Sequence, residues 1–459
     1  MTPDGLQAAQ EKMRAGGQHE EAIRAFTRAY ERLAEGESAV IPSADIEPAQ
    51  GVPMLADLPQ VDGPKALERV VVIKLNGGLA TTMGLQQPKS LVVAHGDLTF
   101  LDIIIGQTLA LRSRYGVRLP LLLMNSQATR EATMDALAGH PELDAGLPLD
   151  FMQSMIPKLE AEQMGPVRWP PNPSLEWCPP GHGDVYGALR RSGILARLLE
   201  EGYRYAMISN SDNLGARVDP RIAAYVESER IPFLMEVVEG TASERKGGHI
   251  AHRCSDGQLI LREIAQTPPE DEESFRDFRH WHYYNANSIW LDLEALSGVL
   301  ERGGGVMELP LIVNHKTVDP RDPDSTPVIQ LESAMGAAIE SFPGAALLEV
   351  PRTRFVPVKT TNDLLVIRSD VYTLRDGMVV EPVTERLGRL PIVDLDREVY
   401  GHLDRFDARF PAGPPSLCRA ERLVVRGDVS FGAGVTIRGS VELEAPTRLA
   451  VGDGSQLSG

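Results

Sequence analysis

The chain has 459 residues, of which 42% are hydrophobic and 24% charged, and 64 acidic against 46 basic residues give a formal net charge of −18. This length exceeds what one hydrophobic core usually supports, so two or three domains are expected, and the composition is that of an ordinary globular protein. No apolar run approaches the ~18 residues of a membrane span, so no membrane-spanning segment is expected. No Lys/Arg cluster could follow a nucleic-acid backbone, so nucleic acid is not an expected partner.

The three cysteines, Cys178, Cys254 and Cys418, lie far apart and form no CxxC pair. This pattern favours free thiols in a reducing compartment, and the start of the chain shows no signal-peptide pattern, so we expect a cytoplasmic protein. A few lysines and a metal ion can still create a local site for a small anion in an acidic protein.

Residues 1–65 are predicted to form an N-terminal helix followed by a linker. Within 17–33, Ala22, Phe26, Ala29 and Leu33 recur with helical spacing, which predicts an amphipathic helix. Residues 36–64 are rich in Pro, Gly, Ser and acidic residues and show no period, which indicates a linker or an arm draped over the next domain.

Residues 66–375 alternate short apolar runs with helical patterns, which predicts one α/β domain. The runs are VVVI (70–73), LPLLLMN (119–125), YAMISNSD (205–212), FLMEVVE (233–239) and YNANSIWL (284–291). Such alternation is typical of a mainly parallel sheet with helices on both faces. Because ligands bind beyond the carboxyl ends of the strands in these sheets, the chemistry is expected there.

A glycine-rich loop follows the first of these strands. The stretch KLNGGLATTMGLQQPKS (74–90) matches neither a Walker motif nor a dinucleotide fingerprint. Its Asn76-Gly77-Gly78 turn would let the backbone approach a ligand and donate free amides to phosphate oxygens, and Lys89 would add a positive charge.

Three further segments place polar side chains at strand ends. Asp212 of SNSDN (209–213) stands where a carboxylate commonly holds Mg²⁺ against substrate phosphates. His182 and Asp184 lie between glycines before a helix in WCPPGHGDVYGAL (177–189), and Lys359 ends an extended run. Each residue alone fits an ordinary surface loop, but together they predict a phosphate-binding site.

Residues 376–459 show a different period. Leu423, Val429, Val435 and Val441 recur every six residues, and Val425, Phe431, Ile437 and Leu443 form a second such series. Hexad repeats are typical of a left-handed parallel β-helix, whereas the alternative, an antiparallel hairpin, explains only the alternation. The pattern fades after Pro446, which predicts little more than one full coil.

The motifs in their order resemble the eukaryotic-type UTP-glucose-1-phosphate uridylyltransferases, or UDP-glucose pyrophosphorylases, over nearly all of 66–445. The resemblance is carried by KLNGGLATTMGLQQPKS, TFLDIIIGQ, PPGHGDVYGAL, ISNSDNLGARVD, YNANSIWLDLEAL, VPRTRFVPVKTTNDLL and RGDVSFGAGVTIRGSVEL. It implies an α/β, Rossmann-like glycosyltransferase-A nucleotidyltransferase domain with a mixed, mainly parallel sheet, followed by a short left-handed parallel β-helix. It also implies Mg²⁺-dependent transfer of a uridylyl group from UTP to glucose 1-phosphate, giving UDP-glucose and pyrophosphate.

The same resemblance implies a role for each matching residue. UTP contacts are expected from Leu75, Asn76, Gly77, Gly78, Lys89, Gln153, Gly181, Asp212 and Lys359. Sugar-phosphate contacts are expected from His182, Asn210, Ser211, Asn285 and Asn287. Lys89 and Lys359 are the expected catalytic lysines, Gln153 would bind the uracil edge, and Asp212 would hold Mg²⁺. A homo-oligomer formed through the β-helix is a further expectation.

Three positions depart from the family pattern: Ala80 and Gln87 replace glycines, and Ser211 replaces an aliphatic residue. A methyl group at Ala80 would restrict the loop if its φ were positive.

Some residues outside these motifs also carry expectations. His280 and His282 are expected to be exposed or packed rather than metal ligands, Glu332 to lie on a helix, and Lys246 to have no catalytic role.

Three other functions remain open. A broad-specificity UDP-sugar pyrophosphorylase would share the reaction. A UDP-N-acetylhexosamine pyrophosphorylase is disfavoured because the chain lacks LxGGxGTRLG. The joint presence of Lys89, Asp212 and Lys359 speaks against a non-catalytic nucleotide-sugar sensor.

Overall fold

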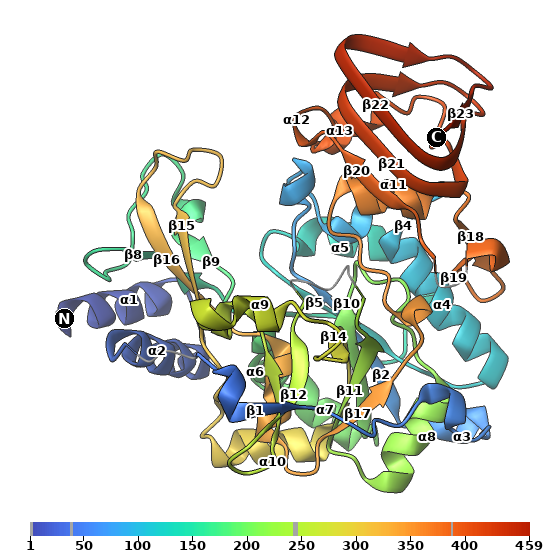
Figure 1. Ribbon diagram of the computed structural model, residues 1–459. Coiled ribbons are helices and arrows are strands. Elements are labelled where there is room, and N and C mark those ends of the chain that lie inside the picture. The colour runs from blue at the N-terminus through green and yellow to red at the C-terminus, as the bar shows by residue number, and fades with distance from the viewer. Residues whose placement is uncertain (1–2, 37–39, 242–246, 387–388) are drawn as a thin grey trace.

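The computed structural model describes residues 3–36, 40–241, 247–386 and 389–459 (Figure 1). A central mixed sheet carries helices on both faces, a helical pair with a small β-layer lies on one side, and a stack of parallel strands lies on the other. The predicted α/β architecture with a mixed, mainly parallel central sheet is confirmed.

Four parallel neighbours form the part of the central sheet that positions the site. In spatial order they are β6 (Asp150–Met152), β5 (Leu121–Asn125), β2 (Val70–Asn76) and β10 (Tyr205–Asn210). Asn76 pairs with Asn125, Asn125 with Met152, and Leu75 with Asn210, so the carboxyl ends of all four strands are aligned. The loops that follow them therefore emerge at one edge.

Antiparallel strands extend the sheet beyond β10. They are β14 (Tyr283–Asp292), β11 (Phe233–Glu239), β12 (His249–Arg253), β13 (Leu259–Arg262) and β1 (Ile46–Pro48), with β17 (Ala346–Glu349) parallel to β11. β1 pairs with β12, so the segment expected to be a linker or draped arm supplies an edge strand of the sheet. The local composition of this segment did not indicate a strand because its partner is distant in sequence.

Both faces of the sheet are covered. Val70 and Val72 of β2 face one apolar cluster, whereas Val71 and Ile73 face another, as the alternation of side chains along a strand requires. The helices of this region are α3 (Gly63–Leu67), α4 (Phe100–Tyr115), α5 (Arg130–Leu137), α6 (Val185–Arg191), α7 (Ile194–Glu200), α8 (Pro220–Glu229), α9 (Glu272–Phe275), α10 (Leu293–Arg302) and α11 (Thr361–Arg368). Helices α4 and α8 contribute to the first cluster, and α6, α7 and α10 to the second.

The N-terminal helices α1 (Pro3–Ala15) and α2 (Glu20–Ala34) share an apolar cluster with a small β-layer. The layer contains β7 (Ile156–Pro157), β8 (Leu159–Glu160), β9 (Trp177–Cys178), β15 (Ile312–Thr317) and β16 (Pro327–Glu332). The predicted amphipathic helix is confirmed, and it buries Ala22 and Phe26. The prediction that Glu332 lies on a helix is wrong, because this residue ends β16.

The C-terminal strands from β20 onward run parallel to one another, whereas β18 and β19 pair antiparallel. After β18 (Tyr372–Arg375), β19 (Val379–Pro382), β20 (Ile392–Leu395), α12 (Arg397–Tyr400) and α13 (Leu403–Asp407) come β21 (Ser416–Phe431), β22 (Thr436–Val451) and β23 (Gln456–Ser458). Ser416 lies beside Thr436 and Leu423 beside Val441, so each coil takes about 18 to 20 residues. The antiparallel hairpin is therefore excluded, and the hexad residues are buried apart from Leu443, which is half-buried.

The stack is longer than the prediction that ended it near Pro446. β22 continues through this proline to Val451, and β23 adds a further parallel pairing with residues 436–438. Proline lacks only its own backbone donor, so one position of a ladder can lose a hydrogen bond without ending the strand.

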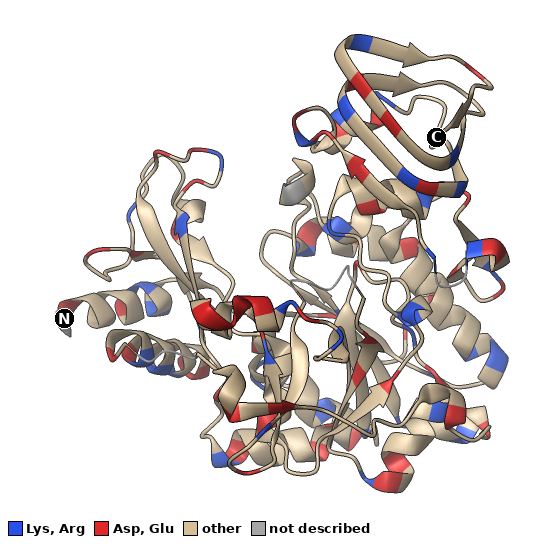
Figure 2. Cartoon of the chain, viewed as in Figure 1, with Lys and Arg blue, Asp and Glu red and all other residues tan. Residues whose placement is uncertain are grey.

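The described residues carry no helix that is both long and apolar enough to cross a membrane. Figure 2 shows Lys and Arg interspersed with Asp and Glu along the elements. The three cysteines are free thiols. Two short strands complete the fold, β3 (Val93–His95) and β4 (Leu98–Thr99).

Candidate active site

The loop after β2 presents its backbone rather than its side chains. Leu75 is 8% exposed and belongs to the apolar core. The amide Nδ2 of Asn76 points inward and donates to Asn125 Oδ1 (2.8 Å) and Thr133 Oγ1 (2.9 Å). The expected contribution of these two residues to nucleotide binding would therefore come from main-chain groups.

Gly77 and Gln153 lie against each other. A Cβ atom at Gly77 would lie 2.6 Å from Gln153 Nε2, so a larger residue would displace the amide. Gln153 follows β6, and its backbone N–H donates to Asn125 O (2.9 Å). A Cβ at Gly78 would meet no atom within 4 Å, which leaves this side of the loop open. The structure thus brings together Gln153, which is expected to bind the uracil edge, and the glycine loop, which is expected to line the nucleotide.

Ala80 has a negative φ of −78°, so its methyl group does not restrict the loop in the way that a positive φ would have required. The residue is fully buried, and its N–H donates to Gln87 O at 3.1 Å. Because Gln87 contributes a backbone carbonyl while its side chain is exposed, both departures from the family pattern fit the loop without backbone strain.

Lys89 and Asp212 form an ion pair between two strand-end loops. Lys89 Nζ lies 2.6 Å from Asp212 Oδ2, and both side chains are largely shielded from solvent. Within the described part of the chain, Asp212 Oδ1 is buried and has no hydrogen-bond partner. The two loops are also joined by the backbone, because Ser211 N–H donates to Leu75 O (3.2 Å). Asn210 is half-buried at the end of β10, and Ser211 is 6% exposed.

The segment that carries Lys359 contacts the Asp212 loop through its backbone. The N–H of the preceding residue, Val358, donates to Asp212 O at 3.2 Å. Lys359 itself is exposed, and its N–H donates to Asp363 Oδ2 (2.9 Å) in the capping box of α11. Burial raises the pKa of the Glu263 carboxyl, and the positive charge of Lys359 opposes this rise. The segments that carry Lys89, Asp212 and Lys359 thus meet at one edge of the sheet.

His182 follows a glycine that no other residue could replace without strain. Gly181 has φ +84°, and a Cβ there would lie 2.4 Å from Ser333 O. The Nδ1 atom of His182 accepts a hydrogen bond from Met335 N–H (2.9 Å), which places the proton of a neutral ring on Nε2. Burial lowers the pKa of His182 to about 4, although Asp212 opposes this effect. His182 is therefore a neutral donor near neutral pH.

Asn285 and Asn287 lie on β14 at the same edge, because Ser288 pairs with Ser209 near the carboxyl end of β10. Asn285 Nδ2 donates to Asn287 Oδ1 (3.1 Å), and Asn287 N–H donates to Asn285 Oδ1 (2.8 Å). Asn287 has φ +51°, a left-handed conformation that asparagine tolerates better than most residues. Strain of this kind often accompanies binding sites. His280 and His282 are both exposed, as expected.

Two side chains support the Gln153 loop, a role that the sequence did not predict. Asp184 Oδ2 accepts the N–H of Ser154 (2.6 Å), and Arg191 Nη2 donates to Asp184 Oδ1 (2.5 Å) and to Ser154 Oγ (2.6 Å). The connection between α1 and α2 also supports this loop, because Gln18 Oε1 accepts the N–H of Met155 at 2.9 Å. Asp184 and Arg191 are seven residues, or two helical turns, apart, and this spacing could have predicted their ion pair. The bond to Ser154 could not have been predicted, because Ser154 lies in a distant part of the sequence.

The described residues contain no cluster of three or more His, Cys, Asp or Glu side chains that could hold a metal ion. Mg²⁺ bound with phosphates, however, commonly uses only one or two protein carboxylates. The unpartnered Oδ1 of Asp212 fits that requirement. Lys246 lies outside the described residues.

Comparisons with known proteins agree on one family. The family model described as UTP-glucose-1-phosphate uridylyltransferase matches residues 23–438. A protein of that name from Hordeum vulgare is 37% identical over 99% of this chain and 95% of its own length, and one from Pyrus pyrifolia is 39% identical over 83% and 79%.

Solved structures resemble the whole chain. A UDP-glucose phosphorylase from Trypanosoma brucei is 41% identical, with a TM-score of 0.93 over 99% of this chain and 98% of that one. A variant of UDP-glucose pyrophosphorylase from Leishmania major in complex with UDP-glucose is 39% identical, with a TM-score of 0.93 over 100% and 99%.

The buried histidines predict a loss of stability in mild acid. His249 is fully buried and stacks on Trp281 at 4.2 Å between ring centroids, and burial and then Arg262 lower its pKa to about 3. Because the unfolded chain binds a proton at this histidine below about pH 6.5 and the folded chain does not, the free energy of unfolding falls as pH falls from 6.5 toward 3.

His249→Phe keeps an aromatic ring but removes the titration. We expect urea denaturation at pH 7, 6 and 5 to show that the free energy of unfolding depends less on pH in the variant. The difference in this pH dependence should be up to about 1.4 kcal/mol per pH unit. Equal slopes in the wild type and the variant would contradict the neutral, buried His249.

Proposed function

The chain belongs to the UTP-glucose-1-phosphate uridylyltransferase family, and on that premise we propose that it transfers the uridylyl group of UTP to glucose 1-phosphate, forming UDP-glucose and pyrophosphate. One observation supports the proposal most: Lys89 and Asp212 form an ion pair beyond the carboxyl ends of the parallel strands, and the segment that leads to Lys359 bonds to the backbone of Asp212. This arrangement suits a reaction in which charge accumulates on phosphate oxygens.

The reaction needs no covalent intermediate. The phosphate oxygen of glucose 1-phosphate is already an anion and can attack the α-phosphorus of UTP in line, so no general base is required. The barrier comes from repulsion between the two anions and from charge that develops on the leaving pyrophosphate. We assign Lys89 to the β- and γ-phosphates and Lys359 to the α-phosphate and the attacking oxygen, where each offsets negative charge.

The nucleotide end of the site rests on backbone groups and one amide. Gln153 can both donate to and accept from the uracil edge. It lies against Gly77, and the open face of Gly78 leaves room for the nucleotide. Leu75, Asn76 and Gly181 would contribute main-chain contacts to the same ligand.

The sugar end uses neutral donors and acceptors. His182 would donate from Nε2 to the sugar phosphate, since its Nδ1 is occupied by Met335 N–H. Asn285 and Asn287 would bind glucose hydroxyls, with Asn210 and Ser211 beside the sugar phosphate. The neutral amides of Asn285 and Asn287 suit the glucose hydroxyls, which carry no charge to be paired.

Asp212 would hold Mg²⁺ through the oxygen that has no partner among the described residues. When bound, this ion would act as a Lewis acid on phosphate oxygens. Lys89 pairs with the other oxygen of Asp212, which places its ammonium group at the end of the site assigned to the phosphates.

Several broader proposals accompany the activity. We assign residues 1–65 to an N-terminal helix and linker, 66–375 to the catalytic domain and 376–459 to a left-handed parallel β-helix, which the hexad spacing and the parallel ladders support. A cytoplasmic location and a homo-oligomer formed through the β-helix are proposed on the cysteine pattern and on the family resemblance, respectively.

A pyrophosphate-release assay tests the activity and its sugar specificity. The purified chain, with UTP and Mg²⁺, is expected to release pyrophosphate fastest with glucose 1-phosphate. Comparable rates with galactose or xylose 1-phosphate would instead favour a broad-specificity UDP-sugar pyrophosphorylase. Release with none of the sugars would contradict catalysis and favour a nucleotide-sugar sensor.

Replacing Lys359 tests its role. Lys359→Ala is expected to raise the barrier by about 2–4 kcal/mol, a loss of roughly 30- to 1,000-fold in kcat, because a preorganised positive charge is removed. Lys65→Ala, which removes an exposed lysine on α3, is the matched control and should leave kcat unchanged. A loss of less than tenfold at Lys359 would remove this residue from the catalytic group.

A further inference from the structure

Asp212 and Lys359 come from segments that are distant in sequence, and the side chain of Asn213 joins these segments. Asn213 is 1% exposed, and its Nδ2 donates to Arg354 O (3.2 Å). Its Oδ1 accepts the N–H groups of Val356 (2.8 Å) and Gly215 (3.2 Å). The amide therefore bonds to its own loop and to the strand-like segment that leads to Lys359.

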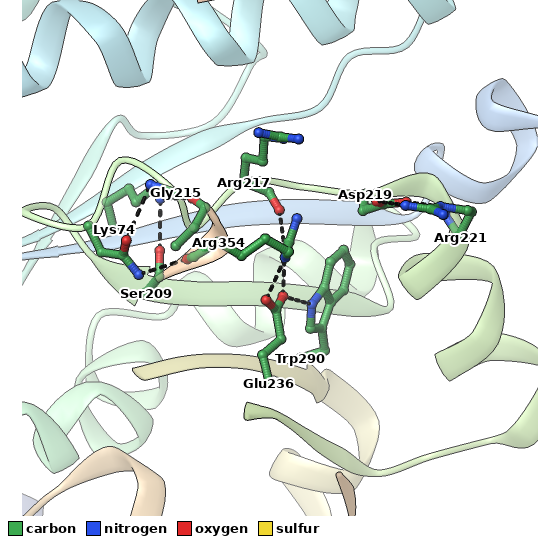
Figure 3. A network of polar contacts seen from close by, with 11 residues as sticks. Lys74, Ser209, Gly215, Arg217, Asp219, Arg221, Glu236, Trp290 and Arg354 are labelled. Atoms are coloured by element: carbon green, nitrogen blue, oxygen red, sulfur yellow. Dashed lines mark hydrogen bonds and ion pairs between the residues drawn. The ribbon is translucent and has the colours of Figure 1, made fainter. Parts of the chain in front are cut away.

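The segment that receives these bonds is fixed to the sheet by a buried ion pair (Figure 3). Arg354 is 2% exposed and donates from Nε and Nη2 to the two oxygens of Glu236 at 2.7 and 2.6 Å. Trp290 Nε1 also donates to Glu236 (3.0 Å), so strands β11 and β14 both take part. Such a buried, doubly hydrogen-bonded pair allows little movement of the backbone at Arg354.

The loop that carries Asp212 is fixed from its other side. Lys74, which is buried on β2, donates to Ser209 Oγ (2.8 Å) and to Ala216 O (2.6 Å), and so joins the residues before and after this loop. The two segments also touch through their backbones, because a Cβ at Gly215 would lie 2.6 Å from Thr353 O. Asn213 thus bridges two segments that are each held rigidly.

We propose that Asn213 is a positioning residue that sets the separation between the Asp212 carboxylate and the Lys359 ammonium group. This inference rests on the proposed function, which makes both groups act on the same phosphates. Since the energy between charges depends on their distance, a small displacement of Lys359 weakens its effect on the transition state.

The Asn213→Ala variant keeps both charged groups but removes the bridge. We expect kcat to fall by about 10- to 100-fold, the scale that a displacement of roughly 1 Å produces. The KM for UTP should change by less than about threefold, since Gln153 and the glycine loop remain in place. An unchanged kcat, or a loss confined to KM, would overturn the proposal.

A matched control separates this effect from a general loss of stability. Thr108→Ala removes a buried polar side chain of α4 whose hydroxyl donates to Ile104 O at 3.0 Å. The control should lower the thermal midpoint slightly and leave kcat unchanged. If it lowered kcat as much as Asn213→Ala, the loss would reflect stability alone and the proposal would fail.

A double variant tests whether Asn213 acts through Lys359. If it does, Asn213→Ala with Lys359→Ala should lose about as much activity as Lys359→Ala alone. Once the ammonium group of Lys359 has been removed, Asn213 has no charge left to position, so its loss lowers the activity no further. Losses that multiply would show that Asn213 acts independently of Lys359.

Hydrogen exchange tests the bridge without any assay of activity. In Asn213→Ala, the amides of Val356 and Val358 should exchange at least about tenfold faster than in the wild type and in Thr108→Ala. If these amides exchanged at the same rate in Asn213→Ala as in the wild type, the proposed role of Asn213 would be overturned, even if the variant had lost activity. An inactive wild type with the expected exchange pattern would contradict the proposed function but leave the bridge demonstrated.

Discussion

The parallel register of β6, β5, β2 and β10 determines where every other part of the site can lie. Because these strands end at one edge, the loops that carry Gly77, Gln153 and Asp212 emerge side by side. The buried amide of Asn76 reinforces this register by bonding to Asn125 on the neighbouring strand. A slip of β2 against either neighbour would separate the glycine loop from the residues that complete it.

Charged and neutral side chains occupy different parts of this edge. Lys89 pairs with Asp212, and the segment that leads to Lys359 bonds to the same loop, so two positively charged residues belong to this part of the edge, which suits an anionic triphosphate. His182 remains neutral because burial opposes its protonation, so it can donate a hydrogen bond without adding a charge. The proposed division of labour follows: cations at the triphosphate and the attacking oxygen, and neutral amides and imidazole at the base, the glucose hydroxyls and the sugar phosphate.

Local patterns predicted the parts of the molecule that depend on nearby residues. The buried strands, the glycine turn after β2 and the inward hexads of β21 and β22 all follow from spacing alone. The strand β1, the continuation of β22 through Pro446 and the bridge at Asn213 could not be predicted, since each depends on a partner distant in the chain. The conformation of Ala80 was likewise undetermined, because an alanine in a loop accepts several φ values. The residue roles taken from the family remain proposals, although the structure gathers these residues at one edge.

We propose that placed charges, rather than a covalent nucleophile, carry the transfer. The most direct test is the stereochemical course with UTP that bears a sulfur on its α-phosphorus in one configuration. A single in-line displacement predicts inversion at that phosphorus in the UDP-glucose product. Retention would require two displacements and hence a covalent uridylyl-enzyme, which would contradict this account.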